Sequence, residues 1–143
     1  MATITYLTKI QFDFGAVQLL AAEMAELGMT RPLLVTDKGV RAVGLLDKVM
    51  EHLPEQCPVE IFDGTPENPT EAAMTVALAQ YREAGCDGLI GIGGGSSMDL
   101  AKAIALMAGQ TGGLWDYLED GAFNAGALDP DVMAPVVAIP TTA

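Results

Sequence analysis

The fold is decided by residues 88–102, which read Gly-Leu-Ile-Gly-Ile-Gly-Gly-Gly-Ser-Ser-Met-Asp-Leu-Ala-Lys. The first five of them, Gly88–Ile92, form a continuous apolar run of strand length, which is typical of a parallel strand covered on both faces. Consecutive glycines follow, and apolar residues then recur at helical spacing, at Leu100, Ala103, Ile104 and Met107. A strand, a glycine turn and a helix in this order predict one half of a βαβ unit.

The same alternation extends over most of the chain. Three more apolar runs of strand length occur, at Leu33–Thr36, Val59–Phe62 and Val136–Ile139. Helical periodicity recurs in three further sets of apolar residues: Val17, Leu20, Ala21 and Met24; Leu46, Val49, Met50 and Leu53; Met74, Ala77, Leu78 and Tyr81. Strands that alternate with helices predict an α/β fold, with an open parallel (Rossmann-like) sheet and helices on both of its faces.

Three segments differ from this pattern. Thr3–Phe14 alternates apolar and polar residues, which predicts an edge strand or a hairpin. Gly109–Asp131 is rich in Gly, Asp and Asn, and we expect packing to order only Leu114–Leu118 within it. Val136–Ile139 is predicted to be a buried strand, and the sequence ends one turn later. We therefore expect residues 1–143 to be a single domain at the front of a longer protein.

Composition and charge exclude several classes of protein. Half of the residues are hydrophobic and 18% are charged, which predicts a buried core rather than disorder. Nineteen acidic residues against seven basic ones give a net charge of −12, which argues against nucleic acid and anionic membranes as partners. The chain shows neither a membrane-spanning apolar run nor a signal pattern. Two cysteines make no disulfide framework, so we expect a cytoplasmic protein.

The glycine turn predicts a cradle for phosphate. Glycine permits positive φ and leaves no Cβ in the way of a ligand, and the following helix presents unpaired N–H groups. Ser96 or Ser97 could cap this helix or donate to a phosphate oxygen. The alternative is a tight turn required by packing alone. The motif is not the usual dinucleotide fingerprint, because Ser96 stands at the sixth position, where that pattern needs Gly or Ala. It is not a Walker loop either, because no Lys-Ser/Thr pair follows the glycines.

Two acidic residues are candidates for ligand contacts. Asp37 follows a predicted strand at the edge where open α/β sheets bind ligands. It could accept hydrogen bonds from ribose hydroxyls or N-cap a helix near Lys38–Ala42, and the two roles can coexist. Asp99, in the predicted first helical turn, could contact a substrate or nicotinamide, or simply favour the helix N-terminus. Lys102 could pair with it.

The other candidate residues give weaker evidence for a functional role. Thr141 and Thr142 follow the last predicted strand and could offer hydroxyl and N–H groups to the same ligand. His52 is the only histidine and is interpreted as a surface residue, while Cys57 and Cys86 lack a C-x-x-C partner. We therefore expect neither a metal site nor a catalytic residue within this chain.

Taken in order, these motifs resemble those of the iron-containing (group III) alcohol dehydrogenases. Gly93–Lys102 is similar to the family's GGGSxxDxxK signature. Phe12–Gly15, Val35–Gly39 and Glu67–Thr70 match further motifs of the family in the same order. Ala138–Ala143 resembles the beginning of its PTTAGTGSE segment. The resemblance thus covers the whole chain.

The resemblance implies that residues 1–143 are the N-terminal cofactor domain of an NAD-dependent dehydrogenase of small alcohols or aldehydes. It also implies cofactor contacts: Asp37 at the adenosine ribose, Asn68 at the adenine, Gly94, Gly95 and Ser96 at the pyrophosphate, Thr141 and Thr142 further along, and Asp99 near the nicotinamide. The family's metal ligands lie on an all-helical C-terminal domain that this chain lacks. A divalent metal, Fe²⁺, is therefore expected only in the full-length parent, and this chain alone is expected to be inactive.

Other interpretations stay open. Glycerol dehydrogenases and dehydroquinate synthases share a similar glycine turn, and maleylacetate reductases use the same architecture without metal. Ser96, the Asn68–Thr70 motif and the two terminal threonines favour the alcohol dehydrogenases. A different class would be a free-standing nucleotide- or phosphate-binding module. We also expect a homo-oligomer, because the face meant for a missing domain would expose apolar surface.

Overall fold

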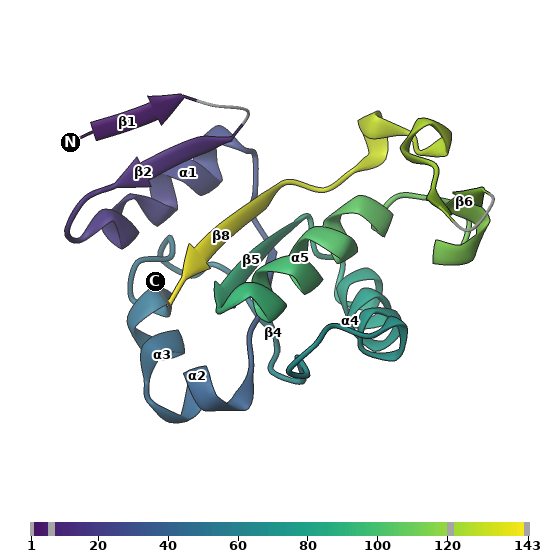
Figure 1. Cartoon of the computed structure of the whole chain (residues 1–143). Helices are drawn as coiled ribbons and strands as arrows, with labels where there is room; N and C mark the ends of the chain where they lie inside the picture. The colour runs from purple at the N-terminus through teal and green to yellow at the C-terminus, as the bar shows by residue number, and fades with distance from the viewer. Residues whose placement is uncertain (1, 6–7, 120–121, 142–143) are drawn as a thin grey trace.

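The computed structural model of the chain describes residues 2–5, 8–119 and 122–141. Its parallel sheet has the strand order β4-β3-β5-β8, and each neighbouring pair is parallel (Figure 1). The predicted α/β fold with an open parallel sheet is therefore confirmed. The strands are β1 (Ala2–Thr5), β2 (Lys9–Phe12), β3 (Pro32–Val35), β4 (Glu60–Phe62), β5 (Gly88–Gly93), β6 (Leu118–Glu119), β7 (Ala122–Phe123) and β8 (Val136–Pro140). The α-helices are α1 (Leu20–Glu26), α2 (Lys38–Ala42), α3 (Leu45–Met50), α4 (Glu71–Glu83) and α5 (Gly95–Met107).

The strand order reverses at the centre of the sheet. From β3 the chain runs through α2 and α3 to β4 on one side of β3, and then through α4 to β5 on the other side. The connections that leave β3 and β5 therefore run toward opposite ends of the sheet. In open α/β sheets such a reversal leaves a crevice at the carboxyl ends of the two central strands, which is where ligands bind.

The central strands point their side chains alternately into two cores. Leu33 and Leu89 are fully buried in the core that contains the apolar faces of α4 and α5. Leu34 and Ile90 are fully buried in a second core, which contains side chains of α1 and α3. The helices thus cover both faces of the sheet, with α4 and α5 on the same face (Figure 1). Continuous rather than alternating apolar strands result from this double burial.

The two long helices follow the sequence signals closely. Thr70 caps α4, since its hydroxyl oxygen accepts from the Ala73 amide at 3.2 Å, and the four predicted apolar positions of α4 are buried. Helix α5 packs directly on β5 at Gly91. A Cβ there would lie 2.9 Å from the Cβ of Ala101 and 3.1 Å from the Cα of Met98, so this position requires glycine.

Three segments differ from their predictions. The helix expected from Ala16 begins with a 3₁₀ turn, and α1 starts only at Leu20. Strand β8 is half-buried rather than buried, because in the described part of the chain it has a neighbouring strand, β5, on one side only. The described residues of the segment 109–131 make more contacts than expected. The Gln110 side chain donates to the Asp129 carbonyl at 2.9 Å and accepts from its amide at 3.2 Å, and Leu128 is buried beside it.

The N-terminal hairpin turns its polar face toward the domain. Strands β1 and β2 pair antiparallel, as the alternation predicts. Lys9 Nζ lies 3.0 Å from Glu23 Oε1 of α1, and Gln11 donates to the same carboxylate at 2.9 Å. Phe12 and Phe14 point away and are 73% and 104% exposed. The apolar face of the hairpin is thus left outside the domain.

Candidate functional site

The carboxyl ends of the four parallel strands meet at one edge of the sheet, here called the carboxyl edge. Three backbone hydrogen bonds tie together the residues that follow the strands: Thr36 N donates to Phe62 O (2.9 Å), Thr65 N to Thr36 O (3.3 Å) and Thr141 N to Gly93 O (2.9 Å). Segments from distant parts of the sequence therefore converge beside the strand-order reversal.

The glycine turn has the geometry of an anion cradle. Gly93 adopts a φ of +144°, a conformation that favours glycine, and Gly94 is the N-cap of α5 without any side-chain cap. A Cβ on Gly95 would meet no atom within 4 Å, so the space beside the first turn is open. Packing explains Gly93, where a Cβ would lie 3.0 Å from Ser97 Oγ, but it does not explain Gly95. An uncapped helix N-terminus beside open space is suited to bind an anion.

Asp37 caps a helix and also faces the glycine turn. Its Oδ1 accepts from the Val40 amide at 2.9 Å, so the N-cap interpretation is confirmed. Its Oδ2 would lie 3.5 Å from a Cβ placed on Gly93, which puts the second oxygen against the turn after β5. Both predicted roles are therefore geometrically compatible, because each uses a different oxygen.

The serines of the turn do not cap α5, and that expectation is wrong. The Ser96 hydroxyl donates to the carbonyl of Glu67, which ties the loop carrying the exposed Asn68 to the first turn of α5. Ser97 is 1% exposed, and its hydroxyl has no hydrogen-bond partner among the described residues. The N-cap position belongs to Gly94, which has no side chain to offer.

Asp99 lies on α5 after this turn, and Thr141 lies beside its first glycine, Gly93. Asp99 sits just beyond the first turn of α5, not within it as expected, and pairs with Lys102 at 3.4 Å. Both side chains are mostly exposed, so the pair contributes little to stability. Thr141 is exposed beside Gly93, while Thr142 lies outside the described residues.

Sequence patterns do not indicate two other features of the carboxyl edge. The first is a set of buried hydroxyls, those of Thr36, Thr65 and Ser97, which find no partner in the described part of the chain. Such groups cost free energy unless water or a ligand bonds them. The second is an ion pair between Arg41 Nη1 and Asp63 Oδ2 at 2.7 Å. A polar residue directly after an apolar strand run, as at Thr36, is the one signal that could have pointed to the hydroxyls.

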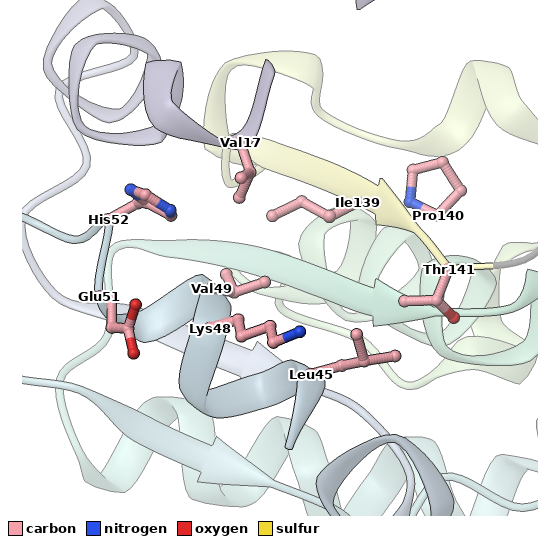
Figure 2. A pocket seen from close by; sticks show the side chains of 9 residues that line it. All are labelled: Val17, Leu45, Lys48, Val49, Glu51, His52, Ile139, Pro140 and Thr141. Atoms are coloured by element: carbon pink, nitrogen blue, oxygen red, sulfur yellow. The ribbon is translucent and has the colours of Figure 1, made fainter. Parts of the chain in front are cut away.

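An apolar hollow of about 460 Å³ lies between the end of β8 and α3, on the face of the sheet that α1 and α3 cover, and shares Thr141 with the carboxyl edge (Figure 2). Its walls come from the start of the first helical segment, from α3 and from the end of β8. It contains neither Asp37 nor the glycine turn, so we place the candidate site at the turn. The lining residues are Val17, Leu45, Lys48, Val49, Glu51, His52, Ile139, Pro140 and Thr141.

The described residues show no cluster of three or more His, Cys, Asp or Glu side chains that could hold a metal ion. Burial, and then the nearby Asp87 carboxylate, raise the pKa of the Cys57 thiol. Burial, and then the Glu60 carboxylate, raise the pKa of Cys86 to about 11. Both thiols are therefore protonated at neutral pH and are poor nucleophiles. Within the same described part, no helix is long and apolar enough to cross a membrane.

A doubly wound parallel sheet with a glycine turn at its strand-order reversal defines the Rossmann-like class of α/β fold. The profile of the family "Iron-containing alcohol dehydrogenase" matches residues 8–143. The chain belongs to this family, which confirms the resemblance seen in its motifs.

Relatives and solved structures agree with this assignment. The chain is 52% identical over 144 residues to 4-hydroxybutyrate dehydrogenase of Cupriavidus necator, covering 99% of this chain and 36% of that protein. It is 34% identical over 130 residues to NAD-dependent methanol dehydrogenase of Bacillus methanolicus, covering 90% and 32%. The structure of a 1,3-propanediol oxidoreductase superimposes with a TM-score of 0.77 at 35% identity, covering 90% and 32%.

A further solved structure, sulfoacetaldehyde reductase from Bifidobacterium kashiwanohense in complex with NAD⁺, shares the fold with a TM-score of 0.74 at 24% identity and covers 90% of this chain and 32% of that one. The chain spans about a third of the length of the curated relatives it matches.

Proposed function

We propose that residues 1–143 form the N-terminal dinucleotide-binding domain of an NAD-dependent alcohol dehydrogenase. The observation that carries this proposal is the position of Asp37. Its free carboxylate oxygen faces the open glycine turn across the strand-order reversal, in a region that the family profile matches throughout. A carboxylate and an uncapped helix N-terminus, side by side, suit the ribose and the pyrophosphate of one dinucleotide.

The turn fits a pyrophosphate through its backbone. The open space beside Gly95 admits phosphate oxygens, and the N–H groups of Gly94, Gly95 and Ser96 would donate to them. Ser96 would act through its amide, because its hydroxyl proton is already given to the carbonyl of Glu67. The N-terminal partial charge of α5, a helix of 13 residues, adds to the attraction.

The other contacts follow from the same placement. Asp37 Oδ2 would accept from the adenosine ribose, while its Oδ1 keeps the cap of α2. Asn68, on the loop fixed by Ser96, would lie at the adenine. Thr141 and Thr142, at the end of β8, would continue the contacts, and Asp99 would lie toward the nicotinamide.

The role of this domain is positional. Bound NAD would supply the hydride chemistry, and the chain would hold the cofactor in one orientation. The described residues do not gather a set of ligands fit for iron, so we assign no metal-dependent step to them. We propose that the metal ligands and the alcohol site belong to the remaining two thirds or so of a protein as long as its relatives, with 4-hydroxybutyrate as the first substrate to test.

Calorimetric titration of this chain with NAD tests the proposal. We expect saturable binding, with no oxidation of small alcohols when Fe²⁺ or Zn²⁺ is added to the isolated chain. Absence of binding at millimolar NAD would contradict the proposal, as would metal-dependent turnover by the isolated chain. Reading the gene past codon 143 separates the domain from a free-standing module: a stop codon there favours the module.

Association is part of the proposal. Phe12, exposed on the outer face of the hairpin, and Phe14, exposed in the turn that follows it, favour a dimer or larger homo-oligomer. Light scattering should show this, and the double variant Phe12→Ser/Phe14→Ser should shift the mass toward the monomer. A wild-type monomer at high concentration would contradict it.

A further inference from the structure

An ion pair links two segments of the carboxyl edge beside Asp37. Arg41 lies one helical turn after Asp37, and its amide donates to the Asp37 carbonyl at 3.2 Å. Its guanidinium nitrogen Nη1 lies 2.7 Å from Oδ2 of Asp63, which follows β4. Gly64, the next residue, forms an isolated antiparallel bridge with Asp37. The ion pair therefore lies beside Asp37, the residue that the proposed function places at the adenosine ribose.

Stability alone does not account for this pair. The side chains of Arg41 and Asp63 are 53% and 33% exposed, and ion pairs this accessible to water contribute little to folding. Their placement has a chemical consequence instead. Arginine is the side chain best suited to bind a phosphate monoester, because its planar guanidinium donates in pairs. The cofactor that carries such a group on the adenosine ribose is NADP, and a nearby arginine commonly accommodates it.

We propose that Asp63 is a specificity-determining residue that excludes NADP by occupying Arg41; this rests on the proposed function. With Asp63 in place, a 2′-phosphate beside Asp37 meets two carboxylates, and the Arg41 guanidinium is held toward Asp63 by the contact of its Nη1 at 2.7 Å. Without Asp63, the guanidinium is one helical turn from Asp37 and free to turn toward the phosphate. Lys38, which is exposed and directly follows Asp37, is a second cation in this segment.

The experiment measures dissociation constants of NAD and NADP by NMR titration of the full 143-residue chain, which reports affinities into the millimolar range. Asp63→Asn should lower the ratio of the NADP to the NAD dissociation constant by about fivefold or more, with NAD affinity unchanged. Arg41→Gln alone should not lower the ratio, and Arg41→Gln combined with Asp63→Asn should lose most of the gain, because only the repulsion by the Asp63 carboxylate is then relieved. Glu55→Gln, an exposed acid in the loop that leads into β4, removes the same charge away from the edge and should have no effect.

Each outcome of these titrations either supports or refutes the role proposed for Asp63. If wild-type chain binds no NAD, the proposed function itself fails. If NAD binds but Asp63→Asn leaves the ratio within twofold of wild type, or the gain persists without Arg41, the role of the ion pair is refuted. If the gain in NADP affinity persists without Arg41 but is lost in Lys38→Gln, the effect belongs to Lys38 and the role of the ion pair is also refuted. Asp63→Ser repeats the test should the asparagine variant unfold, and circular dichroism verifies the fold of every variant.

Discussion

Polar groups at the two ends of the parallel sheet differ in whether they have hydrogen-bond partners. At the amino edge, where β3 and β5 begin, the Asp87 carboxylate accepts from the amide and hydroxyl of Thr30 and from the amide of Arg31, at 2.6 to 3.1 Å. At the carboxyl edge, the buried hydroxyls of Thr36 and Ser97 have no partner within the described residues. One edge is satisfied by the protein alone, and the other leaves donors and acceptors for something else. This difference supports the proposal that the cofactor binds at the carboxyl edge.

The largest expected effect is at the glycine turn. Gly95→Val should weaken NAD binding by about 100-fold or more, because a branched side chain would fill the space where the pyrophosphate approaches the helix. The fold should persist, since a Cβ there meets no atom and Gly95 does not have positive φ. Calorimetry and thermal unfolding measure the two quantities. Gly95→Ala is the graded control, and equal NAD affinity in the valine variant would show that the turn is only structural.

Asp37 gives the next largest effect. Asp37→Gly should weaken NAD binding modestly and strengthen NADP binding, because a carboxylate repels the additional phosphate of NADP. The ratio of the NADP to the NAD dissociation constant should therefore fall by about tenfold or more. Loss of the cap on α2 should lower the free energy of unfolding by less than about 1 kcal/mol. Titrations of both cofactors test this. Asp87→Asn, at the amino edge, should leave the ratio unchanged, and an unchanged ratio in Asp37→Gly would reduce Asp37 to a helix cap.

At the amino edge the effect should be on stability alone. Asp87→Asn should lower the free energy of unfolding by about 2 kcal/mol, because it weakens three hydrogen bonds to a carboxylate. Burial by itself would raise the pKa of Asp87, but the hydrogen bonds from Thr30 and Arg31 outweigh it and hold the pKa below its usual value. The unfolded chain therefore binds more protons, and this stabilisation is present above pH ~4 and lost as the pH falls through the lower folded pKa.

Urea unfolding of both proteins between pH 7 and pH 3 measures this dependence. The wild-type curve should fall more steeply in acid than that of Asp87→Asn. Parallel curves would show that the carboxylate is not stabilised in the folded state.

The smallest effects are expected from two matched substitutions that should change the free energy of unfolding in opposite directions. Thr30→Val removes a hydroxyl that donates to Asp87 at 2.6 Å and should lower the free energy of unfolding by about 1 kcal/mol. Thr36→Val removes a fully buried hydroxyl without a partner in the described chain and should raise it by about 1 kcal/mol. Thermal unfolding of the two variants decides the comparison. A loss of stability in both would show that the carboxyl edge is as well satisfied as the amino edge.

Local sequence signals determined the elements of this protein and the types of residue at its site. Apolar runs placed the four parallel strands to within one residue, because burial on both faces favours apolar side chains, most strictly in the central strands β3 and β5. Asp37 was identifiable as a cap because it lies directly before the predicted helix near Lys38–Ala42. Successive glycines between a strand and a helix indicated the cradle, since only glycine leaves that space open.

Tertiary structure alone decided how these parts face one another. The hairpin alternates as predicted, but only the position of Glu23 on α1 turns its polar face inward and leaves Phe12 outside. The half-burial of β8 depends on how many strands flank it, and the pairing of Arg41 with Asp63 depends on the crossover that brings β4 beside β3. A sequence period reports which residues share a face, whereas the partner of that face is set by long-range contacts that no local pattern encodes.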